Sequence, residues 1–442
     1  MILGAALSVF WPGLSGPFVF DDIPNLKPLG YHGGVVNLDN FIEFVFNGKR
    51  VPGRSLTYLS FLLNDVSWPS NPWPFKYTNL LLHLLNGVLV FILARRLLSL
   101  YRTDPVWRDY TALAVMAVWV LHPIHLSTMM LVIQRLVELM SLFVLLGLVA
   151  YLKGRTLVNQ RPLSGYMWMS AGVGACGILA VLGKENGILL SLYIAVVEYA
   201  VVRPAAGLAP PRYWRLWATV FIIMPLAFLA AYIIARWDIS LTIYETRRAF
   251  SPLERIMTEP RILLDYLYRI FSLRMRGSGL FHDDYPFSTG LFTPPTTLLS
   301  ITLVAGALAW ALIPRFRYRF PLLAFAILWF LAGHAIESTF LHLELYFEHR
   351  NYLPMLGPLL ALVVGLLSVR GKIKRLTIAA LVLFIGLQAV ISWQSAAVWG
   401  DRALFANILV RENPTSQRAR QQAADFWLRK GRVDRALEHL RA

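Results

Sequence analysis

Two adjacent carboxylates follow the first apolar run of the chain. Asp21 and Asp22 lie in PFVFDDIPNL, directly after residues 2–20. Neighbouring carboxylates repel each other and so raise the pKa of one of them, or they share a cation or a proton taken from an acceptor. The pair is therefore either a candidate general base at a membrane surface or an ordinary acidic loop.

Three cationic side chains lie beside other apolar runs. Arg135 lies in HPIHLSTMMLVIQRLVELMSL, Lys184 in GKENG and Arg350 in EHRNYLP. Such cations bind lipid phosphates, and arginine can bind two phosphate oxygens at once. The alternatives are a snorkelling hairpin charge for Lys184, and an ion pair between Arg135 and Glu138, which are three residues apart on a helix.

Amide and imidazole side chains form further polar sets. Asn79, His83 and Asn86 are spaced i, i+4, i+7, so they share one helix face, where we expect them to join helices. His122 and His125 lack a third ligand, so their spacing does not define a metal site. The other candidates near the cations or in the outer loops are Gln134, Glu138, Glu185, His282, Asp283, Asp284, Glu348 and His349.

The composition shows which kind of protein must position these groups. Apolar residues form 57% of the 442 residues and charged residues 15%, against about 25% in soluble proteins, and the mean hydropathy is +0.55. These values predict an all-α integral membrane protein and exclude a disordered chain, a disulfide-stapled module and a soluble enzyme. Cys176 is the one cysteine, so the chain forms no internal disulfide.

The apolar runs predict about eleven transmembrane helices. They lie at 2–20, 77–98, 110–121, 126–152, 166–183, 186–202, 215–235, 294–313, 320–336, 354–369 and 376–393. The run at 110–121 is short for a crossing of about 20 residues and must borrow flanking residues.

The net charge of +17 is explained by the loops between these runs. Basic residues cluster in the loops 95–108, 153–161, 203–215, 315–319 and 370–375. The positive-inside rule places these loops and the N-terminus in the cytoplasm, and the acidic loops and the C-terminus outside. No soluble basic face remains for nucleic acid.

The outer side carries the long loops and the tail. Loops 21–76 and 237–293 contain the segments 38–48, 55–64 and 261–271, which are amphipathic or apolar but too short to span, so we expect interfacial helices. Residues 397–442 are soluble-looking and helical, with Gly431 ending one helix, and resemble one tetratricopeptide (TPR) unit. We therefore predict a membrane domain, 1–396, and an extracytoplasmic tail, 397–442.

The sequence resembles the GT-C superfamily of polyprenyl-phosphate-dependent glycosyltransferases. The Asp-Asp pair after the first helix and the long outer loop carry this likeness. More narrowly, NLLLHLLNGVLVFILARRLL, HPIHLSTMMLVIQRLVEL, LGKENGILLSLYIAVVEY, GLFHDDYPFSTGL and FEHRNYLPMLG are similar to bacterial relatives of the transmembrane-and-TPR O-mannosyltransferases. Those proteins usually carry a long repeat array, whereas this chain has about one unit.

The resemblance implies an inverting transfer from a polyprenyl-phosphate sugar to a hydroxyl of a secreted or surface protein. It implies that Asp21 or Asp22 is the base, and that the donor phosphate is bound by Arg135, Lys184 and Arg350. The supporting residues would be His83, Gln134, Glu138, Glu185, His282, Asp283, Asp284, Glu348 and His349. It further implies a multi-pass protein of the bacterial inner membrane, in contact with membrane lipids, without an organic cofactor and with a divalent cation left open.

Two alternatives use the same residues differently. A glycosyltransferase acting on lipid A or an envelope glycan would have similar site chemistry and another acceptor. A secondary transporter would show inverted repeats and broken helices near the midplane, and the sequence shows neither. The sequence does not identify the sugar, the acceptor, the oligomeric state, or which aspartate is the base.

Overall fold

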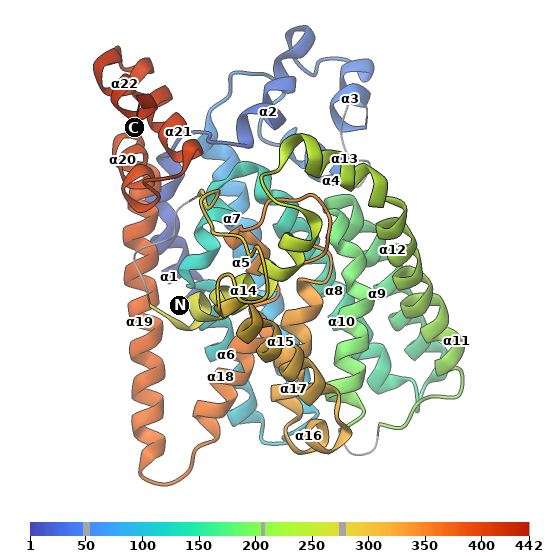
Figure 1. The fold of residues 1–442 in the computed structure, drawn as a ribbon. Helices are drawn as coiled ribbons and strands as arrows, with labels where there is room; N and C mark the ends of the chain where they lie inside the picture. Colours follow the sequence, from blue (N-terminus) through green and yellow to red (C-terminus); the bar gives the residue numbers. More distant parts are fainter. Residues whose placement is uncertain (47–53, 205–207, 274–279, 442) are drawn as a thin grey trace.

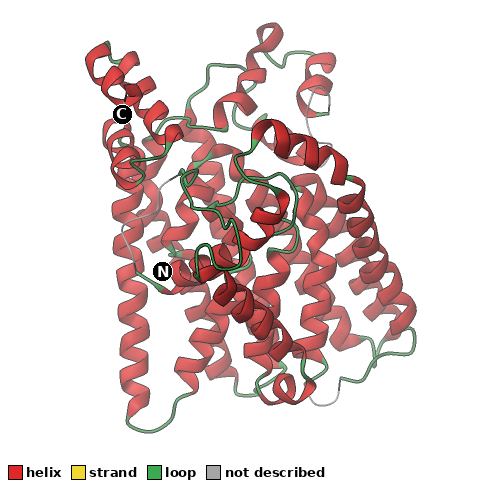
Figure 2. Cartoon of the chain, viewed as in Figure 1, coloured by secondary structure: helices red, strands yellow, loops and turns green. Residues whose placement is uncertain are grey.

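The computed structural model describes residues 1–46, 54–204, 208–273 and 280–441, and the regular secondary structure of these residues is helical. Within those residues the only extended pairing is an isolated bridge between Gly290 and Thr293 (Figure 2). The all-α prediction is confirmed for these residues.

The helices are labelled in Figure 1. Those of the first half are α1 (Ile2–Phe10), α2 (Asp22–Leu26), α3 (Leu38–Val45), α4 (Ser55–Phe61), α5 (Pro72–Ser99), α6 (Pro105–Val120), α7 (Leu126–Met130), α8 (Arg135–Leu157), α9 (Pro162–Gly183), α10 (Leu190–Val197) and α11 (Trp214–Ala218). Those of the second half are α12 (Met224–Ala235), α13 (Trp237–Arg247), α14 (Pro252–Phe271), α15 (Thr296–Leu312), α16 (Pro314–Arg319), α17 (Pro321–Gly333), α18 (Leu356–Ser368), α19 (Ile373–Gly400), α20 (Arg402–Glu412), α21 (Gln417–Arg429) and α22 (Val433–Arg441).

The length and apolarity of these helices show a multi-pass membrane protein. In the described residues, six helices are long and apolar enough to cross a membrane: Pro72–Ser99, Val132–Leu157, Pro162–Gly183, Glu185–Val202, Trp214–Ala235 and Ile373–Gly400. The bent pair Pro105–Val120 and Pro123–Met130 makes up to seven. The other predicted runs are shorter apolar helices, Ile2–Ser15, Thr296–Leu312, Pro321–Gly333 and Leu356–Ser368. All eleven predicted runs are thus largely helical, and the crossing by the four short ones stays a prediction.

Two predicted boundaries are wrong. The run 126–152 is not one helix, because the backbone is extended at Leu131 and a new helix begins at Val132. Residues 126–130 instead follow α6 across a 50° bend at Pro123, whose ring removes a backbone N–H donor. The first helical segment ends at Ser15 rather than residue 20, because Gly16 is extended. Residues 16–20 and the two aspartates that follow therefore form a strap, of which residues 16–19 are not helical.

The helices α8 and α9 approach each other through small residues. A Cβ on Gly154 would lie 2.5 Å from the carbonyl oxygen of Gly165, and a Cβ on Gly172 would lie 2.4 Å from the Cβ of Ala150. Small residues allow such backbone contact between membrane helices. This pair supports the Lys184 hairpin, which directly follows α9.

The predicted charge asymmetry corresponds to two ends of the molecule. Figure 1 shows α2, α3 and the tail helices α20–α22 at one end, and α16 with the α18–α19 connection at the other. The first end carries Asp21 and Asp22, and the second carries two of the five basic loops. The assignment of the first end to the outer side stays a prediction.

The segments expected at the interface are helical, as predicted. The segment 38–48 contains α3, although residues 47 and 48 lie outside the described part of the chain, and 55–64 contains α4. The segment 261–271 is the end of the longer α14, which buries Ile262, Tyr266 and Ile270. One face of α14 is therefore packed against the rest of the membrane domain.

Candidate active site

Asp22 is a buried anchor of the strap. Its side chain is fully buried, and its two carboxylate oxygens accept hydrogen bonds from the backbone N–H of Ile133 at 2.9 Å and of Val19 at 3.2 Å. Burial raises the pKa of Asp22 to about 6, opposed by these bonds and by the charge of Lys76. Because Ile133 lies in the first turn of the helix that begins at Val132, Asp22 satisfies a donor that has no partner within the helix. Asp22 therefore joins the strap to α8.

Asp21 is the accessible member of the pair. Its side chain is half-buried, and no described residue donates a hydrogen bond to its carboxylate. Burial raises the pKa of Asp21, the charge of Arg418 opposes this, Glu344 adds to the rise, and Arg54 lowers it. The preceding residue, Phe20, has a φ of 50°, in the left-handed region that bulky residues rarely adopt. Such strained backbone concentrates at functional sites.

A buried cluster of charges surrounds Glu337. Lys184 Nζ lies 2.8 Å from Glu337 Oε1, and Arg350 Nε lies 3.5 Å from Glu337 Oε2. Burial alone would raise the pKa of Glu337, but the charges of Lys184 and Arg350 hold it well below its ordinary value. Burial also lowers the pKa of His349 beside them, so its imidazole is neutral. Together with Asn186 these side chains line a pocket of about 20 Å³, room for about one water molecule.

One chain of ring contacts from Phe20 and one charge interaction between Arg54 and Asp21 connect this cluster with the strap. The Phe20 ring lies 6.4 Å from the Phe347 ring, on which His349 stacks at 5.0 Å. On the other side, Arg54 pairs with Glu185 at 3.0 Å, and Glu185 follows Lys184 in the chain. The structure thus brings together the strap, the hairpin and the segment before α18.

Arg135 lies apart from this cluster. Its buried guanidinium donates to Asn79 Oδ1, Asn64 Oδ1 and the carbonyl oxygens of Ser60 and Phe75, at 2.7–2.9 Å. These acceptors replace the cavity or anion that an unsolvated arginine otherwise requires. The geometry gives Arg135 the role of joining α4, α5 and α8, and it does not support contact with a phosphate.

The expected Arg135–Glu138 pair is not formed. Glu138 is fully buried, and its carboxylate oxygens have no hydrogen-bond partner among the described residues. The guanidinium of Arg135 points instead to α4 and α5, where it finds uncharged acceptors. Gln134 is buried at the break before α8.

The polar face of α5 joins helices, as expected. Asn79 Nδ2 lies 3.3 Å from the carbonyl oxygen of Leu131, and His83 lies 2.9 Å from Tyr352 Oη through Nδ1. Asn86 donates to the carbonyl oxygen of Glu138 at 3.0 Å and to Tyr352 Oη at 3.1 Å. These bonds tie α5 to α8 and to the segment before α18.

The remaining supporting residues form a second network. Glu348 pairs with Arg269 of α14 at 3.0 Å, and His282 Nε2 lies 3.7 Å from the same Glu348 oxygen. Asp283 and Asp284 accept hydrogen bonds from the tail hydroxyls of Ser416 and Thr415. Glu348 and His282 thus support the segment that bears Arg350, whereas the two aspartates hold the tail.

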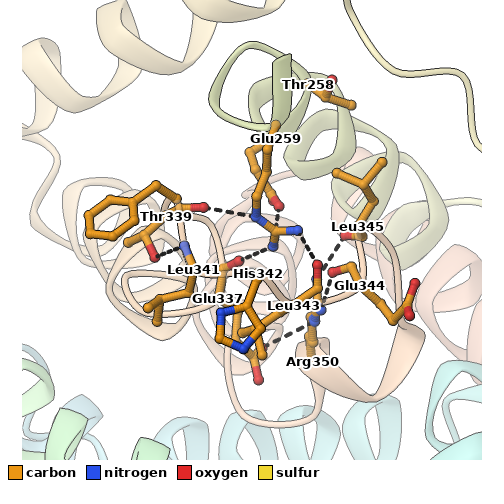
Figure 3. Close-up of polar contacts among 12 residues, drawn as sticks. Thr258, Glu259, Glu337, Thr339, Leu341, His342, Leu343, Glu344, Leu345 and Arg350 are labelled. Carbon is orange, nitrogen blue, oxygen red and sulfur yellow. Dashed lines mark hydrogen bonds and ion pairs between the residues drawn. The ribbon is translucent and has the colours of Figure 1, made fainter. Parts of the chain in front are cut away.

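Arg255 of α14, which the sequence reasoning missed, holds the loop between Glu337 and Arg350. Its guanidinium is fully buried, pairs with Glu259 at 2.7 Å, and donates to the carbonyl oxygens of Glu337, Thr339 and Leu343. Figure 3 shows Glu337, Thr339 and Leu343 of this loop beside Glu259, with Arg350 bonded to the carbonyl oxygens of Glu344 and Leu345. One buried side chain thereby fixes the segment on which two members of the charge cluster lie.

Replacing Arg255 with methionine is expected to destabilise this loop severely. The change leaves Glu259 and three carbonyl oxygens without their partner, a loss of about 3–5 kcal/mol. Thermal unfolding in detergent and protease cleavage within 337–347 measure it. Arg261→Met on the same helix is the control, because Arg261 is half-exposed and its hydrogen bonds to described residues go to Pro286 and Ser288. Equal unfolding midpoints for the two variants would contradict this role.

No group of three or more His, Cys, Asp or Glu side chains in the described ranges could hold a metal ion. His122 and His125 are both buried; His122 Nε2 bonds to the carbonyl oxygen of Ile270. The expectation that a divalent cation could accompany the phosphate of the sugar donor is not tested by this finding.

An apolar groove lies beside the charge cluster. Its volume is about 420 Å³, and its walls come from α14, α15, α17 and α18, including Leu267, Val304, Ala307, Phe330 and Ala361. The helices that line the groove also carry or adjoin charged residues. Arg269 lies on α14, Glu337 follows the end of α17, and Arg350 lies shortly before α18. An apolar chain in this groove would therefore place its polar end near the cluster.

Comparison with known proteins finds partial similarity to protein O-mannosyl-transferases. The chain is 30% identical over 156 residues to protein O-mannosyl-transferase TMTC2 of Mus musculus, and equally to TMTC2 of Homo sapiens. The match covers 35% of this chain and only 17% of each relative. No family model matches the chain, and no solved structure gives a significant match. The chain therefore has distant, partial similarity to protein O-mannosyl-transferases.

Proposed function

We propose that the chain transfers a sugar from a polyprenyl-phosphate donor to a hydroxyl of a secreted or surface protein, at the outer face of a bacterial inner membrane. The observation that carries this proposal is the grouping of an accessible carboxylate, two buried cations and an apolar groove at one end of a membrane domain. The partial similarity to protein O-mannosyl-transferases supports the same reaction class.

The reaction is a single displacement with inversion at the sugar. The acceptor oxygen forms a bond to the anomeric carbon while the bond from that carbon to the phosphate oxygen breaks. The acceptor proton passes to a carboxylate, and the lipid phosphate leaves as an anion stabilised by nearby cations.

Asp21 is the base in this proposal, and Asp22 positions it. Both oxygens of Asp22 are occupied by backbone donors, whereas the carboxylate of Asp21 receives none from the described residues. The left-handed Phe20 turns the strap so that Asp21 emerges beside the contacts to Phe347.

Lys184 and Arg350 bind the donor phosphate in this proposal. Glu337 neutralises them in the structure, and the small pocket leaves no room for a phosphate group. An incoming phosphate must therefore displace Glu337 from at least one cation. Lys184 retains unused N–H donors for this, because its only bond within the described residues is to Glu337.

Filling the apolar groove is expected to weaken donor use. Ala361→Trp places an indole where the lipid tail would lie, and we expect the KM for a long-chain donor to rise about tenfold while kcat changes little. Ala305→Trp is the matched control, because Ala305 lies on α15 outside the groove and is exposed. A KM that both substitutions change equally would argue against the groove as the lipid site.

The acceptor is identified by comparing a deletion strain with its complemented parent. Mass spectrometry of intact envelope proteins and of lipid A reports both products. The proposal expects a protein to lose the mass of a sugar residue and to regain it only with the active chain. Loss confined to a lipid or envelope glycan would replace the protein acceptor with that alternative.

A further inference from the structure

The C-terminal tail is packed against the strap that carries Asp21. A Cβ on Gly16 would lie 2.0 Å from the carbonyl oxygen of Trp399, and a Cβ on Gly400 would lie 2.1 Å from that of Pro12. Phe405 and Leu409 of α20 lie in one hydrophobic cluster with Leu14 and Val19. The end of α19 and the start of the tail therefore form one unit with the strap.

Hydrogen bonds fix the next part of the tail. Ser416 is fully buried, donates to Asp283 and accepts from the backbone N–H of Ala419 at 3.0 Å, which caps α21. Thr415 donates to Asp284 at 2.8 Å. These contacts set the position of the first turn of α21, where Arg418 lies.

Arg418 reaches from that turn to the surroundings of Asp21. Its Nη2 lies 2.8 Å from Glu344 Oε1, and its guanidinium carbon lies 5.5 Å from the centre of the Phe20 ring. Phe20 immediately precedes Asp21 and has the left-handed backbone. Glu344 also binds Arg248 at 2.7 Å, and its carbonyl oxygen accepts from Arg350. Arg418 thus lies between the strap and the loop that bears Arg350.

We propose that Arg418 is a positioning residue for Asp21, so that the C-terminal tail completes the site of the membrane domain. The guanidinium covers the Phe20 ring, which is consistent with its holding the strained turn, and it supplies a positive charge to the carboxylate that follows. In this proposal the tail is part of the site, because one of its side chains lies beside the strap that carries Asp21.

The charges around Asp21 determine in which direction the pKa of Asp21 changes when Arg418 is replaced. Burial raises the pKa of Asp21, while Arg418 of α21 and Arg54 before α4 lower it and Glu344 of the loop raises it. Without Arg418 the lowering charge is lost and Glu344 is left less compensated. The pKa of Asp21 then rises, and the carboxylate becomes protonated at a higher pH.

The experiment measures the protonation of Asp21 in the purified full chain. A water-soluble carbodiimide with an amine labels protonated carboxyl groups, and mass spectrometry of the peptide containing Asp21 gives the pH midpoint of labelling. Arg418→Gln is expected to raise this midpoint by about one pH unit, and Arg418→Lys to restore part of the shift. Arg420→Gln is the control on the same helix, because the hydrogen bond that the Arg420 side chain makes within the described residues goes to the carbonyl oxygen of Pro414.

The inference rests on the proposed function for its catalytic meaning, but the labelling does not depend on transfer. An unchanged midpoint in Arg418→Gln overturns the positioning role, even if the wild-type chain transfers sugar. A raised midpoint in a chain that transfers no sugar keeps the Arg418–Asp21 connection and removes the proposed reaction. With transfer, the acid limb of the pH–rate profile moves upward together with the labelling midpoint.

Discussion

Asp21→Asn is expected to lower sugar transfer by about 10²–10⁴-fold without loss of folding. The amide cannot accept the proton of the acceptor hydroxyl, and general-base assistance contributes a factor of this size. No backbone donor among the described residues depends on Asp21, so its replacement leaves the strap in place. Initial rates with a polyprenyl-phosphate sugar, together with the thermal unfolding midpoint, measure both effects.

Comparing Asp21→Asn with Asp22→Asn distinguishes a catalytic role from a structural one. Asp22→Asn keeps the shape of the side chain but offers a single acceptor oxygen to two backbone donors, so we expect a lower unfolding midpoint as well as lower activity. Asp39→Asn, in the first turn of α3, is the control for charge at the same end of the molecule and should leave both quantities unchanged. Wild-type activity in Asp21→Asn, or an Asp21→Asn variant as unstable as Asp22→Asn, would reverse the assignment of the two residues.

Lys184→Met is the substitution with the second-largest expected effect. Loss of one cation that stabilises the leaving phosphate is expected to lower kcat/KM by about 10²–10³-fold. Glu337 keeps Arg350 as a partner at 3.5 Å, so part of the charge compensation remains. Steady-state rates over a range of donor concentrations measure the change. Lys153→Met is the matched control, because Lys153 lies over Trp168 on the predicted cytoplasmic side.

A double variant distinguishes phosphate binding from a merely structural ion pair. In Lys184→Met with Glu337→Gln, the buried carboxylate that lost its nearer cation is itself removed, so we expect part of the stability lost in Lys184→Met to return, while Arg350 loses its partner at 3.5 Å. Transfer should stay low, because the cation for the phosphate is still missing. Recovery of activity in the double variant would show that Lys184 acts only as a partner of Glu337.

The sequence predicted the helices well because apolar length and basic loops are local signals. The tail pair was predicted from Gly431, which has a φ of 72° where α21 gives way to α22. The break at Leu131 was missed, because the apolar run continues through it and only Pro123 hints at a bend. The close approach of α8 and α9 was missed as well, since single glycines in an apolar run do not identify their partner helix.

The candidate site was predicted in part. Lys184, Arg350 and His349 were found because short polar interruptions of apolar runs are visible in the sequence, and the structure brings them together. Glu337 was missed as their partner, because the contact joins residues 153 positions apart. That separation leaves no trace in a local pattern.

Two assignments of chemical roles stay predictions, and the structure shows structural contacts for the same residues. Arg135 was assigned to phosphate because a buried arginine is costly, and in the structure Asn64 and Asn79 accept its hydrogen bonds. Asp283 and Asp284 were assigned to support of the site, and in the structure they accept hydrogen bonds from the tail that carries Arg418. Their partners lie too far along the chain for spacing to reveal them.

The most direct test of the central claim uses the purified chain in proteoliposomes with a labelled polyprenyl-phosphate sugar and an envelope-protein acceptor. The account predicts that the wild-type chain incorporates sugar into protein and releases free polyprenyl phosphate in equal amounts. It also predicts that Asp21→Asn does neither while remaining folded. Sugar incorporation by Asp21→Asn at the wild-type rate, or the absence of transfer from any polyprenyl-phosphate sugar by the wild-type chain, would contradict the account.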